Sequence, residues 1–212
     1  MSNSDLFDQS VSAQLQKAIL KLIFEGCKTA SEHCYGNFNS TRIAKDVSGV
    51  YRRGVIEDQW SGIPVRFPQV AMRPNWYRHY TGSYCELTCG DVKLTQSCVI
   101  YRGDIPRVAE YRSTLATNGQ MDLCFEADGG DEGDTVPKYL YAILTYGIDT
   151  SAKKREQPAF VKIEFPNCTC TEPVDEGINL IKRYPEIAMQ YLSKPSFDAA
   201  VTERPARRRK IA

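Results

Sequence analysis

The stretch YCELTCGDVKLTQSCVIY, residues 84–101, carries the clearest structural pattern in this chain. Gly90 and Asp91 form a pair suited to a tight two-residue turn, and apolar and polar residues alternate on both sides of it. The pattern therefore predicts a β-hairpin that turns at Gly90-Asp91. The cross-strand pairs that follow from this turn are Cys89 with Val92, Leu87 with Leu94, and Cys85 with Gln96.

The alternation assigns the two faces of the hairpin to different surroundings. The face predicted to lie on the core comprises Cys85, Leu87, Cys89, Val92, Leu94, Cys98 and Ile100. The face predicted to meet water comprises Glu86, Thr88, Lys93, Thr95 and Ser97. Antiparallel sheets commonly have one buried and one solvated side, so we expect one wet face here.

Helical periodicity predicts four helices around the hairpin. Residues 5–34 form one amphipathic helix, 106–116 a short helix, and 175–192 a helix bent near Pro185. Residues 40–60 form another, whose apolar side comprises Ile43, Val47, Val50, Tyr51 and Val55. The polar side of that helix carries Arg42, Lys45, Arg52 and Arg53.

Two further strands are predicted, over residues 139–146 and 159–165, whereas residues 63–84 are expected to be irregular because of Pro64, Pro68 and Pro74. The chain is thus predicted to be an α+β protein, with an antiparallel sheet (the hairpin plus two further strands) packed against N- and C-terminal helices. We expect one domain over residues 1–194, its helical part at about 5–61, and a basic tail over 195–212.

Composition narrows the class of protein. Hydrophobic residues make up 42%, charged residues 25%, and the net charge is +1, which are globular values. Bulk charge therefore does not indicate a nucleic-acid-coating protein. The N-terminal MSNSDLFDQS lacks the features of a signal peptide, and no apolar run is long enough for a membrane span. We expect a cytoplasmic protein with no membrane association.

Eight cysteines are a high number for such a chain. Cys85, Cys89, Cys168 and Cys170 have spacings that can supply four thiolates to zinc. The first two lie on the apolar face of the predicted hairpin, where cysteine acts as a small hydrophobe. Core filling is therefore the preferred interpretation, and we expect neither metal nor cofactor. Zinc binding and redox or nucleophilic chemistry stay open as the alternatives.

The usual catalytic patterns are weak or missing. Asp91-x-Lys93 has the spacing of a metal-dependent nuclease, but Asp91 lies in the hairpin turn, and Glu164 has no lysine two residues later. Glu57 and Asp58 are the other candidate acids. The two histidines, His33 and His79, give little basis for His-dependent catalysis, and no phosphate-binding glycine loop occurs.

The Arg/aromatic segment, residues 66–84, is the most suggestive surface. Its candidate partner-binding residues are Arg66, Arg73, Trp76, Tyr77, Arg78 and Tyr80. Arginine and aromatic residues dominate the binding energy of protein interfaces, and they also stack bases and hold phosphates. A third interpretation is that the aromatics cover the edge of the core.

Three short stretches together resemble uncharacterised bacterial proteins of accessory or mobile-element type. They are Leu94-Thr95-Gln96-Ser97, then Pro106-Arg107 with Tyr111-Arg112, then Leu140-Tyr141-Ala142-Ile143-Leu144-Thr145-Tyr146-Gly147. The resemblance implies a bacterial or phage origin and carries no catalytic residues.

The sequence therefore predicts a non-enzymatic binding or regulatory protein of a bacterial or phage accessory system that acts through a protein partner. The first alternative is a nucleic-acid-binding protein that uses the Arg/aromatic segment and the basic run Arg207, Arg208, Arg209 and Lys210. The second alternative is a metal-dependent nuclease.

Overall fold

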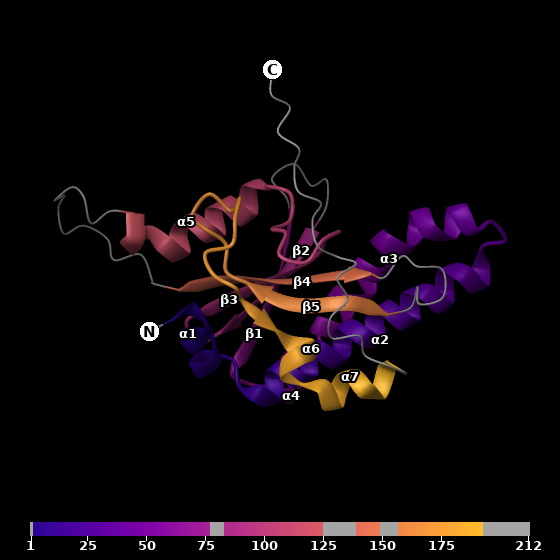
Figure 1. Ribbon diagram of the computed structural model, residues 1–212, viewed down its shortest axis with the longest axis horizontal. Helices are drawn as coiled ribbons and strands as arrows, with labels where there is room; N and C mark the ends of the chain where they lie inside the picture. Colours follow the sequence, from indigo (N-terminus) through magenta and orange to yellow (C-terminus); the bar gives the residue numbers. More distant parts are fainter. Residues whose placement is uncertain (1, 77–82, 125–138, 149–156, 193–212) are drawn as a thin grey trace, which may run out of the picture.

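The computed structural model describes residues 2–76, 83–124, 139–148 and 157–192 (Figure 1). Its helices are α1 (Asn3–Ser10), α2 (Ala13–Asn37), α3 (Thr41–Trp60), α4 (Ile63–Arg66), α5 (Glu110–Cys124), α6 (Leu180–Arg183) and α7 (Pro185–Tyr191). Its strands are β1 (Val70–Trp76), β2 (Ser83–Cys89), β3 (Val92–Cys98), β4 (Leu140–Ile148), β5 (Pro158–Glu164) and β6 (Ile178–Asn179). None of the helices in these ranges combines the length and the apolar content that crossing a membrane requires.

The strands form one six-stranded sheet in the order β1–β2–β3–β4–β5–β6. Neighbouring strands run antiparallel, except that β3 and β4 are parallel. Parallel neighbours need a crossover connection, and α5 lies within it. The architecture confirms the predicted α+β class, and β1 and β6 extend the predicted sheet at its two edges.

Helices cover both faces of the sheet. Figure 1 shows α1, α2, α6 and α7 on one face and α5 on the other. The larger core lies under the first group and includes Phe24, Ile56, Trp60, Leu87 and Tyr146. A smaller core lies under α5 and comprises Leu115, Ala116, Tyr141, Ile143 and Cys170. The sheet therefore separates two layers of side chains.

The hairpin between β2 and β3 is confirmed, with Cys89 paired with Val92 and Leu87 with Leu94. The predicted pair of Cys85 with Gln96 is not formed, because the pairing of β2 with β3 extends only as far as Leu87 and Leu94. Gly90 has a φ of +54°, which a residue with a side chain seldom adopts. The prediction is wrong at the end of β3, where Cys98 is exposed and Ile100 is 77% exposed. The reason is that β3 stops at Cys98, and Val99 takes the buried position with its N–H on the Tyr146 carbonyl.

The predicted wet face of the hairpin is also wrong. Glu86 and Thr95 are buried, while Thr88, Lys93 and Ser97 are half-buried. The second helical layer explains the difference, because α5 and the residues around it cover this face of the sheet. Both faces of the central strands are therefore enclosed, which alternation within the hairpin did not indicate.

The N-terminal helical part contains a break that the periodicity did not predict. α1 ends at Val11, which has an extended backbone, and α2 starts after Ser12. The Ser12 hydroxyl accepts the Leu15 N–H at 3.3 Å and so caps the second helix. One helix over residues 5–34 is therefore wrong, since local capping and the bend of the chain around the hairpin end outweigh the continuous apolar stripe.

α3 buries a different side from the one that the sequence predicted. Ile43, Val47 and Val50 are exposed. The buried residues are Ala44, Ser48, Arg52, Ile56 and Trp60, which recur every four residues. Small residues on this side let α3 approach α2 closely, and a Cβ at Gly26 of α2 would lie 2.5 Å from Ile56 Cγ1.

Residues 63–84 are not irregular throughout, because they include α4 and β1. Proline is compatible with both elements: Pro64 lies in the first turn of α4, and Pro74 lies in a strand at the sheet edge.

The remaining elements differ from the predictions mainly in their limits. The strands predicted over 139–146 and 159–165 are confirmed as β4 and β5. The helix predicted over 106–116 begins at Glu110 and continues to Cys124. The single helix predicted over 175–192 is instead β6, α6 and α7, because residues 178–179 pair with β5 and Pro185 starts a new helix.

Candidate functional site

The Arg/aromatic segment lies at one edge of the sheet, where β2 is the single strand neighbour of β1 within the described ranges. Arg66 and Arg73 are exposed, and Trp76 is 66% exposed. The other candidates, Tyr77, Arg78 and Tyr80, lie outside the described residues. So does the basic run Arg207, Arg208, Arg209 and Lys210.

Arg73 and Trp76 project to opposite faces of the sheet. In the β1–β2 register Arg73 is opposite Glu86, on the α5 side, whereas Val70 and Met72 pack on the larger core. Side chains alternate along a strand, so Trp76 shares the side of Val70 and Met72. The structure therefore does not gather these two side chains into one patch; it sets them on the two sides of one strand edge.

The main chain of β1 has hydrogen-bonding groups directed away from β2. The Val70 N–H bonds to the Phe67 carbonyl at 2.9 Å, and Pro74 has no N–H. Alternate residues of an antiparallel strand direct both main-chain groups to the same side. Met72 and Trp76 share this alternation with Val70 and Pro74, so their N–H and C=O groups face the outer edge.

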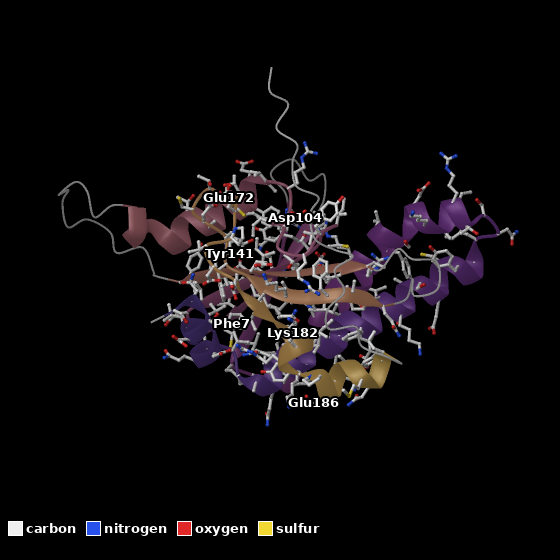
Figure 2. The ribbon with its side chains drawn as sticks, viewed as in Figure 1. Phe7, Asp104, Tyr141, Glu172, Lys182 and Glu186 are labelled. Atoms are coloured by element: carbon white, nitrogen blue, oxygen red, sulfur yellow. The ribbon has the colours of Figure 1, made fainter. Side chains whose placement is uncertain are left out.

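A polar layer lies on the α5 face of the sheet. The Thr95 and Tyr141 hydroxyls are 2.8 Å apart, and Figure 2 places Tyr141 between α5 and the sheet. Lys93 Nζ lies 3.5 Å from Glu86 Oε1 and 4.2 Å from the centre of the Tyr139 ring. These groups satisfy one another, so the layer acts as a second, polar core.

The most buried ion pair in this layer joins Lys162 and Glu164. Nζ lies 2.9 Å from Oε1, and the Glu164 side chain is fully buried. Burial raises the pKa of Glu164, while the hydrogen bond and charge of Lys162 act in the opposite direction. Glu164 is thus a structural carboxylate rather than an open metal ligand.

The four cysteines of the zinc hypothesis are not brought together. Cys85 and Cys89 belong to the larger core, whereas Cys170 belongs to the core beneath α5. The sheet separates the two groups. Burial raises the pKa of Cys85 and of Cys170 to about 11 in each case, as expected for thiols that fill a core.

The acids of the nuclease hypothesis are also dispersed. Asp91 is exposed in the hairpin turn, Glu57 accepts hydrogen bonds from Arg53 and Gln96, and Glu164 is paired with Lys162. Within the described ranges no three His, Cys, Asp or Glu side chains are arranged to hold a metal ion. His33 stacks on Tyr51 with ring centres 4.4 Å apart, and His79 lies outside the described residues.

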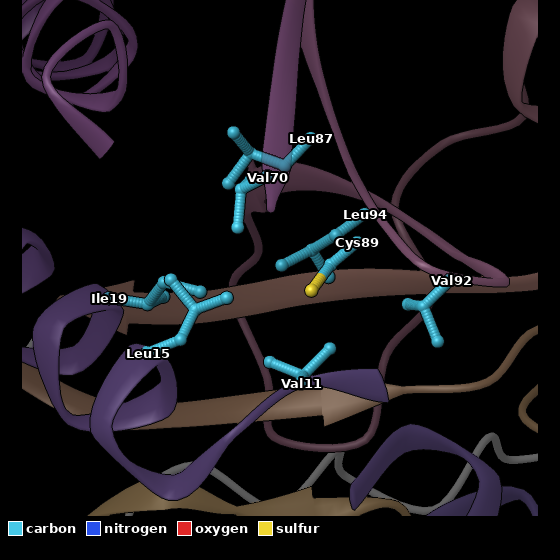
Figure 3. Close-up of a pocket in the computed structure, with 8 residues that line it drawn as sticks. All are labelled: Val11, Leu15, Ile19, Val70, Leu87, Cys89, Val92 and Leu94. Atoms are coloured by element: carbon cyan, nitrogen blue, oxygen red, sulfur yellow. The ribbon is translucent and has the colours of Figure 1, made fainter. Parts of the chain in front are cut away.

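A small apolar hollow lies between the α1–α2 junction and the hairpin (Figure 3). Its lining comprises Val11, Leu15, Ile19, Val70, Leu87, Cys89, Val92 and Leu94. The one sulfur in this lining, Cys89 Sγ, donates to the Ser10 carbonyl at 2.8 Å. The hollow offers a ligand no polar group for orientation, so we assign it to core packing.

Sequence reasoning missed a cluster around Arg52. This residue was assigned to the polar side of its helix, but it is only 8% exposed. Its NH1 lies 4.0 Å from Cys98 Sγ, and its Nε has no hydrogen-bond partner. The four-residue recurrence of Ala44, Ser48, Ile56 and Trp60 was the signal that could have placed Arg52 on the buried side.

Comparison with known proteins adds no family: no family model, no curated protein and no solved structure matches the chain. The candidate sites therefore depend on their own geometry. They are the outer edge of β1, whose main chain can pair with another extended chain, and the cluster around Arg52, whose positive charge can stabilise an anion.

Proposed function

We propose that this chain is a non-enzymatic protein-binding component that captures an extended segment of a partner along the outer edge of β1. The observation that carries the proposal is a seven-residue edge strand with no second strand neighbour among the described residues. Met72 and Trp76 present outward main-chain donors and acceptors that can pair with another extended chain, whereas the Val70 N–H is already bonded and Pro74 has no N–H.

The side chains of β1 support the same kind of partner. Arg73 and Trp76 flank the edge from the two faces of the sheet. An added strand also alternates its side chains between the two faces, so it contacts both residues at once. Arginine and tryptophan are the residues that most often dominate binding energy at protein interfaces.

A protein segment fits this edge better than a nucleic acid. Arg73 is the one basic residue within β1, whereas tracking a phosphate backbone requires several cations. Nucleic-acid binding is the second candidate and is supported by the exposure of Arg66 and Arg73. The resemblance of three short stretches to bacterial accessory proteins is the basis for proposing a bacterial or phage setting for the partner.

The test uses linear peptides selected from a random displayed library on the immobilised protein. For the selected peptide we expect Arg73→Ala with Trp76→Ala to weaken binding by about 2 kcal/mol or more, because both anchors are lost. Met72→Pro should also weaken it, since proline removes an outward N–H while leaving the bonds to β2 intact. Val50→Ala, on the exposed side of α3, is the matched control and should bind as the parent does.

The melting temperature of each variant is measured alongside its binding, so that a loss of binding can be distinguished from a loss of folding. A library without binders, or binding that survives both edge variants, contradicts the proposal. A collapsed melting temperature in the double variant would show that Arg73 and Trp76 cover the edge of the core instead. A single-stranded oligonucleotide is tested in parallel, and oligonucleotide affinity that falls steeply with salt in the parent but not in the double variant would indicate phosphate contacts and a nucleic-acid ligand.

A further inference from the structure

A buried guanidinium in this protein lacks a carboxylate partner. Arg52 makes no ion pair with any described residue, although it is 8% exposed, and its Nε donates to nothing. Removing a charge from water is costly unless an opposite charge or hydrogen bonds compensate it. The surroundings of Arg52 are therefore suited to an anion.

Among the described residues, the groups whose pKa Arg52 affects are three thiols and a phenol, which are uncharged when protonated. Its charge lowers the pKa of the thiols of Cys27, Cys34 and Cys98 and of the Tyr146 phenol, although desolvation keeps all four raised. Of these four residues Cys98 is the exposed one, and it is the one that NH1 contacts. Cys98 is therefore an exposed residue whose partly buried sulfur lies beside a cation with no other partner among the described residues.

We propose that Cys98 is a site of reversible oxidation by hydroperoxides and that Arg52 stabilises the anionic oxidised sulfur. The thiol first releases its proton to solvent, and the thiolate sulfur attacks one peroxide oxygen. The S–O bond forms as the O–O bond breaks, the departing alkoxide takes a proton from solvent, and the sulfenic acid then loses its proton to solvent to give the sulfenate. The sulfur loses two electrons, and the hydroperoxide is reduced to an alcohol, or to water when it is hydrogen peroxide.

The oxidised sulfur carries a negative charge that Arg52 can stabilise, whereas the thiol is neutral. A sulfenate carries its negative charge on an oxygen bonded to the sulfur, and Arg52 NH1 lies 4.0 Å from that sulfur. Charge-assisted hydrogen bonds to guanidinium are the strong class of such bonds. A small thiol restores the site in two exchanges: the first releases water and forms a mixed disulfide, and a second thiol then frees Cys98.

The experiment treats the intact protein with one equivalent of hydrogen peroxide in the presence of dimedone and maps the adducts by mass spectrometry. Cys168 is the internal control, because it is partly exposed. We expect Cys98 to be labelled faster than Cys168, because Arg52 stabilises the negative charge on the oxidised sulfur, even though desolvation raises the pKa of the Cys98 thiol. Equal or slower labelling of Cys98 overturns the proposal.

Two further measurements separate the role of Arg52 from simple exposure. In Arg52→Gln the labelling preference for Cys98 should fall severalfold, and an unchanged preference would show that exposure alone explains it. If that variant does not fold, the wild-type protein still decides the question. Its melting temperature should rise after oxidation and stay constant in Cys98→Ser, whereas a fall on oxidation contradicts stabilisation by Arg52.

Discussion

Charged side chains inside this protein differ in how they are compensated. Glu164 is buried with a lysine partner at 2.9 Å, and Glu86 has Lys93 within reach. Arg52 has a thiol as its polar contact and no carboxylate among the described residues. The two glutamates complete a polar core, whereas Arg52 marks a place where the fold retains an uncompensated cation.

The buried carboxylate of Glu164 should make stability depend on pH. Its pKa is raised in the folded state, so above the ordinary pKa of glutamate the unfolded chain releases this proton before the folded one does. The contribution of Glu164 is full below that ordinary pKa and is lost as the pH rises through the folded value. Because glutamine does not titrate, Glu164→Gln should remove the part of the decrease in unfolding free energy with rising pH that Glu164 causes.

Urea denaturation from about pH 4 to about pH 7 measures this contribution as the difference between parent and variant. Glu172→Gln is the control, because Glu172 is exposed. If Glu164→Gln and the parent have parallel pH profiles, the carboxylate does not retain its proton as proposed.

The pairing of α2 with α3 shows how local residue choice sets the approach of two helices. Gly26 faces Ile56, where a Cβ would lie at 2.5 Å, whereas Gly49 of α3 faces open space. Two glycines in helix interiors thus have opposite roles. The first permits the close contact that buries Ala44, Ser48 and Arg52, and the second is a site of weak helix propensity.

Alanine substitutions at these glycines should have effects of opposite sign. Gly26→Ala should lower the free energy of unfolding by about 1–3 kcal/mol, because the new methyl overpacks the helix contact. Gly49→Ala should raise it by about 0.5–1 kcal/mol through helix propensity alone. Denaturant melts of both variants test this, and a destabilised Gly49→Ala would mean that the outer side of α3 is covered.

The sheet as a whole divides the protein into two compartments, and this division governs its cysteine chemistry. Cys85 and Cys89 lie on one side, and Cys170 lies on the other. Zinc coordination needs thiolates that converge on one point at about 2.3 Å each, which a sheet between them prevents.

Chelation should therefore leave the protein intact. We expect the melting temperature to be the same before and after dialysis against EDTA, and elemental analysis to find no stoichiometric zinc, because no metal contributes to folding. Thiol titration of the denatured, unreduced chain should find all eight cysteines free. A large drop in melting temperature with EDTA would contradict this arrangement of the thiols.

Local chemistry in the sequence was sufficient for the hairpin and for the α+β class. Gly90 and Asp91 set the turn, and the two pairs next to it, Cys89 with Val92 and Leu87 with Leu94, followed because the turn sets the register of a tight hairpin. The strands over 140–148 and 158–164 were also recognisable from local sequence, because they are continuous runs rich in residues that favour strands.

The sequence did not determine which surfaces are buried. The outward apolar side of α3, the enclosed polar face of the hairpin and the contact of Arg52 with Cys98 all involve neighbours that are distant in the chain. Periodicity describes only how one element divides its own residues. Whether a given side meets solvent or another layer depends on how α2, α5 and the sheet pack together, and the tertiary structure alone established that packing.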